Sequence, residues 1–295
     1  SNSILYASEN HFYIAASESI YTVISIFTFD LEPVGCVRVC GHVLNQFSMD
    51  EYNNTFRVVT TDTARNATEL NAITIFDISK NYERVGYLDQ GIGLDRQIVK
   101  SVRYDKNTCY VVTYQNTDPL YEIDCSDPTK PVIVSAYKAP GYSNYLHTFV
   151  VDGKEYVLGL GFTDSLINPK ISVYENTSDG TTQIGKDFIL VKVLYMDEGD
   201  YVNSRLHSNM FSNHKALFFY EKEGKLYLGT KVADDAYLIF EIDVKNEDQV
   251  VSIYKEIELD KSHLSDSRAF LVKDNLYVTN EDTVKVVEFF QDLGE

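Results

Sequence analysis

The stretch KSVRYDKNTCYVVTYQNTDPLYEIDCSDPTKPVIVSAYKAPG, from Lys100 to Gly141, decides the fold class. It contains four short runs rich in β-branched and aromatic residues: KSVRYD, TCYVVTYQ, PLYEID and PVIVSAYKAPG. Asn, Asp, Pro and Gly separate the runs, and this pattern predicts β-strands joined by tight turns. The stretch therefore predicts one four-stranded antiparallel sheet.

The same grouping of strands recurs along the chain. Comparable groups begin at SILYASENHFYIAAS, FSMDEYNNTFRVVTT, LHTFVVDGKEYVLGLG and HKALFFYEKEGKLYLGTKV. A four-stranded unit repeated every roughly 35 to 65 residues is typical of a β-propeller, and no apolar pattern predicts a helix longer than two turns. We therefore predict an all-β chain that forms a single β-propeller domain of about six blades, with seven blades as the alternative.

The predicted blades are unequal in strand number. They cover residues 1–41, 42–91, 92–140, 141–192, 193–260 and 261–295. The last contains only three strand-like runs, in SRAFLVKDNLYVTNEDTVKVVEFF. We therefore expect its outer strand to be missing. Either the ring closes without the usual strand exchange, or the natural protein has more chain upstream.

Charge and hydropathy limit the classes of partner that the protein can bind. The 26 basic and 44 acidic residues give a formal net charge of -18, which repels phosphate backbones and anionic lipid surfaces. No apolar run approaches the roughly 18 residues that a membrane-spanning helix needs. We expect a monomer that binds a protein, peptide or glycan, and neither nucleic acid nor direct membrane insertion is expected.

Three aspartates end predicted third strands, and four cysteines are spread over the chain. Asp77, Asp124 and Asp243 each precede a turn, where an Asp side chain accepts hydrogen bonds from backbone N–H groups two residues on. Cys36 and Cys40 alternate on one face of one strand, roughly 13 Å apart, which is too far for a disulfide. Together with Cys109 and Cys125 they are expected to be buried free thiols.

Four stretches resemble a known family. LNQFSMDEY (44–52), VRYDKNTCYVVTYQNTDPLYEIDCSDPTKP (102–131), PGYSNYLH (140–147) and NHKALFF (213–219) are similar to the secreted β-propellers of bacteria and archaea that are distantly related to WD repeats. The resemblance implies an extracellular or cell-surface propeller, usually the C-terminal part of a longer exported protein, and no established activity. The chain departs from the family pattern at Asn213, where an acidic residue is expected, and at Cys125, where an aliphatic one is usual.

The positions just before the predicted first strands of blades two to six carry no acidic residue, although the chain as a whole is acidic. They are Gln46, Lys100, His147, Lys215 and Arg268, with His214 adjacent. Asn2 would complete the set. If these side chains converge on the propeller axis, they form a positive ring that attracts an anionic or carboxylate-bearing ligand. His147 and His214 would then strengthen binding as the pH falls through about 6 to 7. The alternative is that these residues cap strand ends and pair with neighbouring acids.

A catalytic function is the second hypothesis. The common enzyme motifs are absent, and the aligned positions supply none of the paired carboxylates that glycoside hydrolysis needs. Glu51 and Asp266 keep open a hydrolase or lyase that acts on polysaccharide or peptide at the mouth of the axis. Asp197–Asp200 and the pair Asp234 and Asp235 are the richest oxygen clusters, but they lack calcium-loop spacing and are expected to be solvated turns. We predict no metal or cofactor and favour a non-catalytic binding or scaffold module.

Overall fold

The protein consists of β-strands, turns and short 3-10 helices in the computed structural model. The structure describes residues 3–63, 70–93, 96–114, 118–163, 168–177, 179–190, 213–233, 236–260, 267–280 and 283–290. Asn2, Asp197–Asp200, Asp234, Asp235 and Asp266 lie outside these ranges. Within them, no helix is long and apolar enough to cross a membrane.

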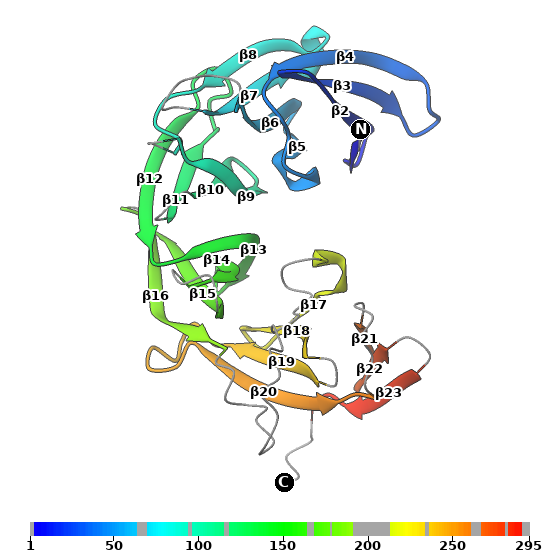
Figure 1. Ribbon diagram of the computed structural model, residues 1–295, viewed down its shortest axis with the longest axis vertical. Coiled ribbons are helices and arrows are strands. Elements are labelled where there is room, and N and C mark those ends of the chain that lie inside the picture. The colour runs from blue at the N-terminus through cyan, green and yellow to red at the C-terminus, as the bar shows by residue number, and fades with distance from the viewer. Residues whose placement is uncertain are drawn as a thin grey trace. The chain divides into compact units, whose positions relative to one another are not determined.

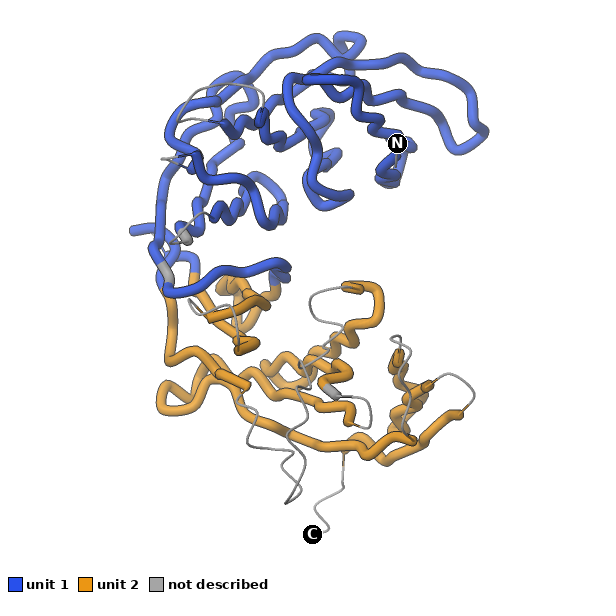
Figure 2. Tube along the Cα trace, viewed as in Figure 1, with its two compact units in different colours: residues 1–148, 176–182 blue, residues 149–175, 183–295 orange. Residues whose placement is uncertain are grey.

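The chain forms two compact units (Figure 2). The first unit contains residues 1–148 and 176–182, and the second contains residues 149–175 and 183–295.

Three four-stranded sheets make up most of the first unit (Figure 1). The first sheet contains β1 (Ile4–Ala7), β2 (His11–Glu18), β3 (Tyr21–Thr28) and β4 (Pro33–Cys40). The second contains β5 (Met49–Tyr52), β6 (Thr55–Thr61), β7 (Asn71–Asp77) and β8 (Glu83–Leu88). The third contains β9 (Ile98–Asp105), β10 (Thr108–Tyr114), β11 (Asp118–Asp124) and β12 (Val132–Ala139). In each sheet the strands are antiparallel and pair in chain order.

Three further sheets follow in the chain. The fourth contains β13 (Tyr142–Val151), β14 (Lys154–Phe162), β15 (Pro169–Thr177) and β16 (Gly180–Ile189), with residues from both units. The fifth contains β17 (Phe218–Lys222), β18 (Lys225–Ala233), β19 (Ala236–Ile242) and β20 (Val251–Glu258). The sixth contains, among the described residues, β21 (Arg268–Val272), β22 (Asn275–Asn280) and β23 (Thr283–Glu288). The prediction of an all-β chain with about six sheets is confirmed, and the described part of the last sheet has three strands.

Neighbouring sheets pack face to face within each unit. Tyr13 and Ile24 of the first sheet share a buried core with Phe56 and Val58 of the second, and the rings of Tyr13 and Phe56 stack at 4.2 Å. The other face of the second sheet packs on the third. The fifth and sixth sheets share a separate core in the second unit. This stacking explains why strand residues that face a neighbouring sheet are apolar, and why β7, which has a sheet on both sides, is buried at nearly every position.

The predicted aspartate turns are confirmed. Asp77, Asp124 and Asp243 accept hydrogen bonds from the backbone N–H groups of Ser79, Ser126 and Lys245 at 3.0, 2.8 and 3.0 Å. Because these carboxylates already accept bonds from their own turns, their recurrence reflects turn chemistry.

The cysteine prediction is only partly right. All four thiols are free, but Cys36 and Cys40 are exposed, and only Cys109 and Cys125 are buried. Cys36 and Cys40 do share a face of β4, as expected, but Val37 and Val39 occupy the face that packs on the core. Alternation places both cysteines on one side of the strand without deciding which side is buried.

Candidate functional site

The residues predicted to form a cationic ring lie at different places relative to the strands than the sequence indicated. Lys100 and His147 lie inside β9 and β13, and Arg268 is the first residue of β21, so the prediction that these residues precede a strand is wrong. Gln46 lies in the 3-10 turn η1 (Gln46–Ser48), and His214 and Lys215 lie in η4 (His214–Ala216). The strands β9 and β13 begin before the patterns used to align them, which explains the shift.

The two 3-10 turns are equivalent in detail. Asn45 caps η1 by accepting a hydrogen bond from the Phe47 N–H, and Asn213 caps η4 by accepting one from the Lys215 N–H. Gln46 therefore corresponds to His214, whereas the sequence alignment paired it with Lys215. Asn is a preferred cap because its side-chain oxygen satisfies a backbone donor at the start of the turn.

The first unit brings one of the predicted residues into a mixed cationic and aromatic cluster. Phe47 of η1 meets Tyr145 of β13 edge to face at 5.5 Å. The Arg103 guanidinium of β9 lies 5.5 Å from the centre of the Phe47 ring. His147 of β13 is close enough that the charge on Arg103 affects its pKa. We call Phe47, Arg103, Tyr145 and His147 the Arg103 cluster. Lys215, His214 and Arg268 belong to the second unit.

The positive charge of Arg103 is not neutralised by an ion pair with a described carboxylate. Its Nε is buried without a hydrogen-bond partner, and it forms no ion pair with any described residue. The nearby carboxylate of Asp50 is bound by Arg57, whose Nε donates to it at 3.0 Å and which is only 2% exposed. Burial raises the pKa of Asp50 although the charges of Arg57 and Arg103 oppose this. The hydrogen bonds of the Asp50 carboxylate therefore go to Arg57, and Arg103 forms no ion pair with a described residue.

His147 does not supply the predicted pH response. Burial, helped by the positive charge of Arg103, lowers the pKa of His147 to about 4. Its side chain is therefore neutral from pH 6 to 7, where protonation was expected to strengthen ligand binding. The prediction assumed an ordinary pKa, and the half-buried position beside a cation is what changes it.

Two further buried polar atoms on the same elements have no partner among the described residues. Ser48 of η1 is fully buried, and its Oγ makes no hydrogen bond. Asn144 Oδ1 of β13 is likewise buried and unsatisfied. β9 and β13 are adjacent here, since Ser101 Oγ donates to the Ser143 carbonyl at 3.0 Å. Buried polar atoms are nearly always satisfied, so unfilled donors and acceptors on neighbouring elements point to bound water or a ligand.

Glu51, one of the two carboxylates on which the catalytic hypothesis depends, is fully engaged. It accepts hydrogen bonds from Tyr13 at 2.6 Å, Ser8 at 2.7 Å, Asn10 at 2.9 Å and His11 Nδ1 at 3.0 Å. Burial acts to raise the pKa of Glu51, but these hydrogen bonds outweigh it, and the pKa lies below its usual value. We infer that Glu51 joins the first sheet to the second and is not poised for proton transfer.

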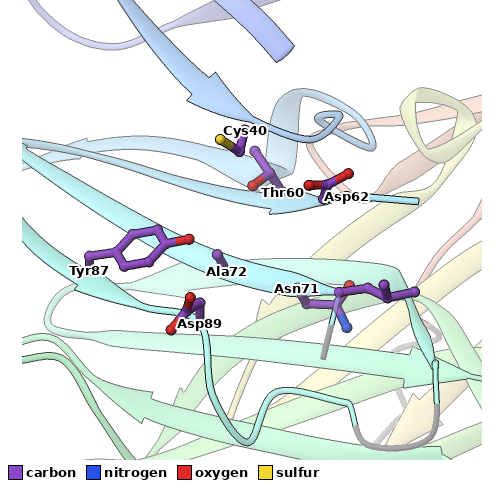
Figure 3. Close-up of a pocket in the computed structure, with 8 residues that line it drawn as sticks. Cys40, Thr60, Asp62, Asn71, Ala72, Tyr87 and Asp89 are labelled. Carbon is purple, nitrogen blue, oxygen red and sulfur yellow. The ribbon is translucent and has the colours of Figure 1, made fainter. Parts of the chain in front are cut away.

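The described residues contain no group of three or more His, Cys, Asp or Glu side chains placed to hold a metal ion. The recess shown in Figure 3 encloses ≈ 230 Å³, part of it open to solvent. Its lining residues are Cys40, Thr60, Asp62, Leu70, Asn71, Ala72, Tyr87 and Asp89. Asp62 lies beside Thr60, and Asp89 lies beside Tyr87 (Figure 3). The two carboxylates make this recess unsuitable for an anion, and none of the predicted site residues lines it.

Sequence reasoning missed Phe47, Arg103 and Tyr145. The sequence did hold a signal for these residues, because three of the four motifs that carry the family resemblance contain every member of the Arg103 cluster. They are LNQFSMDEY, the stretch that begins VRYD, and PGYSNYLH. The predicted site was limited to positions before strands, so it left out the aromatic residues Phe47 and Tyr145 and Arg103, which lies inside β9.

A family model described as "Beta propeller domain" matches residues 1–291. The chain belongs to this β-propeller family. The propeller is 33% identical over 213 residues to an uncharacterised protein of Archaeoglobus fulgidus, a match covering 72% of this chain and 30% of that protein. It is 38% identical over 174 residues to an uncharacterised protein of Methanocaldococcus jannaschii, covering 58% and 26% respectively. The propeller thus spans about a quarter to a third of the length of these curated relatives.

Solved structures support the fold of the propeller. AztD of Citrobacter koseri aligns with a TM-score of 0.53 at 13% identity, covering 97% of this chain and 67% of that one. The WD40 domain of Toxoplasma gondii coronin aligns with a TM-score of 0.50 at 10% identity, covering 93% and 63%. At such low identity these similarities concern the fold alone.

Proposed function

We propose that this β-propeller is a non-catalytic binding or scaffold module, acting outside the cell or at its surface, that receives an anionic ligand at the Arg103 cluster. The ligand is a carboxylate-bearing or otherwise anionic glycan, peptide or protein segment. The observation that carries the proposal is the unpaired, partly buried guanidinium of Arg103 in a chain of net charge -18.

The chemistry of the cluster favours an anion. A guanidinium offers donors in a planar fork that matches carboxylate, sulfate and phosphate groups. Phe47 and Tyr145 supply apolar surface beside that charge, and the buried Ser48 hydroxyl can donate or accept. Partial burial strengthens such a contact because water competes less for the charged groups.

Isothermal titration with citrate, sulfate and an oligogalacturonate at low ionic strength tests the proposal. At least one of these anions should bind, and Arg103→Glu should weaken binding at least tenfold. Arg84→Glu is the matched control, because Arg84 is an exposed arginine on β8 with the same change in charge. Absence of binding by all three anions, or equal loss in the Arg84 variant, would show that the Arg103 cluster is not the site.

The predicted cationic ring is tested by the same titration. If the second unit contributes, Lys215→Glu and Arg268→Glu should also weaken binding. If both variants bind like the unaltered protein, the first unit receives the ligand alone and the ring prediction is wrong.

The proposed location rests on the resemblance to exported propellers. Labelling intact cells of the source organism with a membrane-impermeant amine reagent should modify the protein. Labelling only after lysis would contradict a surface location.

A further inference from the structure

Three asparagines of the chain lie in the motif Asn-X-Ser or Asn-X-Thr, with X other than proline, to which N-linked glycans are attached. The three motifs are Asn53-Asn54-Thr55, Asn66-Ala67-Thr68 and Asn176-Thr177-Ser178. The second lies outside the described residues. Asn53 and Asn176 are described, and their surroundings differ.

Asn53 lies at the tip of the hairpin between β5 and β6. β5 ends at Tyr52 and β6 begins at Thr55, so Asn53 and Asn54 form a two-residue turn. Both have positive φ angles, 45° and 61°, which are typical of hairpin turns that prefer Asn or Gly. Asn53 is exposed, and its side chain makes no hydrogen bond with a described residue. Its amide nitrogen is therefore accessible to an enzyme.

The other side chains of this turn have partners. Thr55 Oγ1 donates to the Tyr52 carbonyl at 2.7 Å, and Asn54 Nδ2 donates to Asp77 Oδ1 at 3.3 Å. The positive φ angle accounts for an asparagine backbone at position 53. It makes no use of the Asn53 amide, which projects from a hairpin held by its neighbours.

Asn176 is the contrasting case within the same chain. It lies inside β15 and is only partly exposed. Its Nδ2 donates to Tyr110 Oη of the third sheet at 2.9 Å. A sugar on this nitrogen would have to displace that contact between two sheets, so the motif at Asn176 is not expected to be used.

We propose that Asn53 is a modification site that carries an N-linked oligosaccharide. The inference rests on the proposed location outside the cell, because this motif is an acceptor in secreted proteins. A bond forms between Asn53 Nδ2 and the anomeric carbon of the first sugar. The bond between that carbon and a phosphate oxygen of a lipid-linked sugar donor breaks. The phosphate leaves with the electron pair, and the amide nitrogen loses one proton to a base.

The position of Asn53 keeps the glycan away from the Arg103 cluster. β5 separates the hairpin turn from η1, which carries Phe47. Its four residues, Met49–Tyr52, span roughly 13 Å at about 3.3 Å per residue. Loss of the glycan should therefore leave anion binding unchanged, so the two proposals can fail independently.

Peptide mass spectrometry of the protein purified from its source organism tests the proposal. After digestion with trypsin, Asn53 lies in the peptide of residues 39–57 and Asn176 in that of residues 171–186. The first peptide should carry added masses of sugar residues, and fragmentation should place them on Asn53. The second should be found only at its unmodified mass.

Variants expressed in the same organism identify the acceptor. Asn53→Gly and Thr55→Ala should each abolish the modification, and Thr55→Ser should retain it because the hydroxyl remains. Asn54→Gly is the matched control, since it changes the neighbouring exposed asparagine and leaves the motif intact. Glycine accepts the positive φ at both positions, so both variants should keep the hairpin.

Three results would overturn the proposal. An unmodified 39–57 peptide from protein that is labelled on intact cells would refute glycosylation and leave the proposed location standing. An unmodified peptide from protein that is labelled only after lysis would refute both. A modification that persists in Asn53→Gly would show that another residue carries it.

Discussion

Two charged residues in the first unit, Glu51 and Arg103, differ in how fully their charges are paired. Glu51 is one carboxylate with four donors around it, all from β2 or the turn before it. Arg103 is one cation that forms no ion pair with a described residue, and the nearby carboxylate of Asp50 is bound to Arg57. A satisfied buried charge holds sheets together, whereas an unsatisfied one has binding capacity left for a ligand. The contrast supports a structural role for Glu51, and it is the basis of the binding role proposed for Arg103.

The largest expected effect is on Glu51. Glu51→Ala should lower the free energy of unfolding by about 3 kcal/mol, because the donors of Ser8, His11 and Tyr13 lose their acceptor in a mostly buried site. Urea denaturation measures the change. Glu51→Gln keeps an acceptor oxygen and should lose less. If Glu51→Ala lowers the free energy of unfolding by less than about 0.5 kcal/mol, Glu51 does not have the structural role that distinguishes it from Arg103.

The second prediction concerns how the contribution of Glu51 to stability changes at acidic pH. The pKa of Glu51 in the folded protein lies below its ordinary value, so folding favours the ionised carboxylate. The stabilisation from Glu51 is therefore complete above its ordinary pKa of about 4.3 and is lost as the pH falls through the folded value. The stability difference between the unaltered protein and Glu51→Gln, measured by denaturation from pH 7 to 3, should shrink toward the acid end. A difference that grows on acidification would contradict the direction of this shift.

A third, smaller effect is expected at Arg103. Arg103→Met keeps most of the apolar stem and removes a charge without an ion-pair partner, so stability should change by less than about 1 kcal/mol while anion binding is lost. Denaturation and titration of the same sample give both values. A loss of several kcal/mol would mean that Arg103, like Glu51, acts in holding the fold.

The smallest effect is expected at His147. Because its pKa is lowered to about 4, this side chain should remain neutral from pH 8 to 5.5. The pH profiles of anion binding for the unaltered protein and for His147→Gln should therefore run parallel over this range. A rise in affinity below pH 7 that disappears in the variant would show that His147 becomes charged when the ligand binds.

Much of the fold could be predicted because it depends on residues close together in sequence. The runs between Lys100 and Gly141 matched β9 to β12 closely, and Asp124 accepts from Ser126 N–H just as its turn position predicts. The candidate site was predicted less well. His147 was predicted as part of a cationic ring, but its pKa is lowered to about 4, and Arg103, which lies beside it, was missed.

The sequence by itself determined the strands, the turns and the acidic charge, since alternation, turn residues and composition act over a few neighbouring positions. Only the tertiary structure decided which charges are neutralised. Glu51 meets Ser8 and Tyr13 across 43 and 38 residues of chain. Asp50 binds Arg57 across neighbouring strands of one sheet, and the Arg103 Nε has no hydrogen-bond partner among the described residues. Sheet stacking determines the contacts of Glu51, because it brings distant side chains together, removes water from them and so shifts their pKa values.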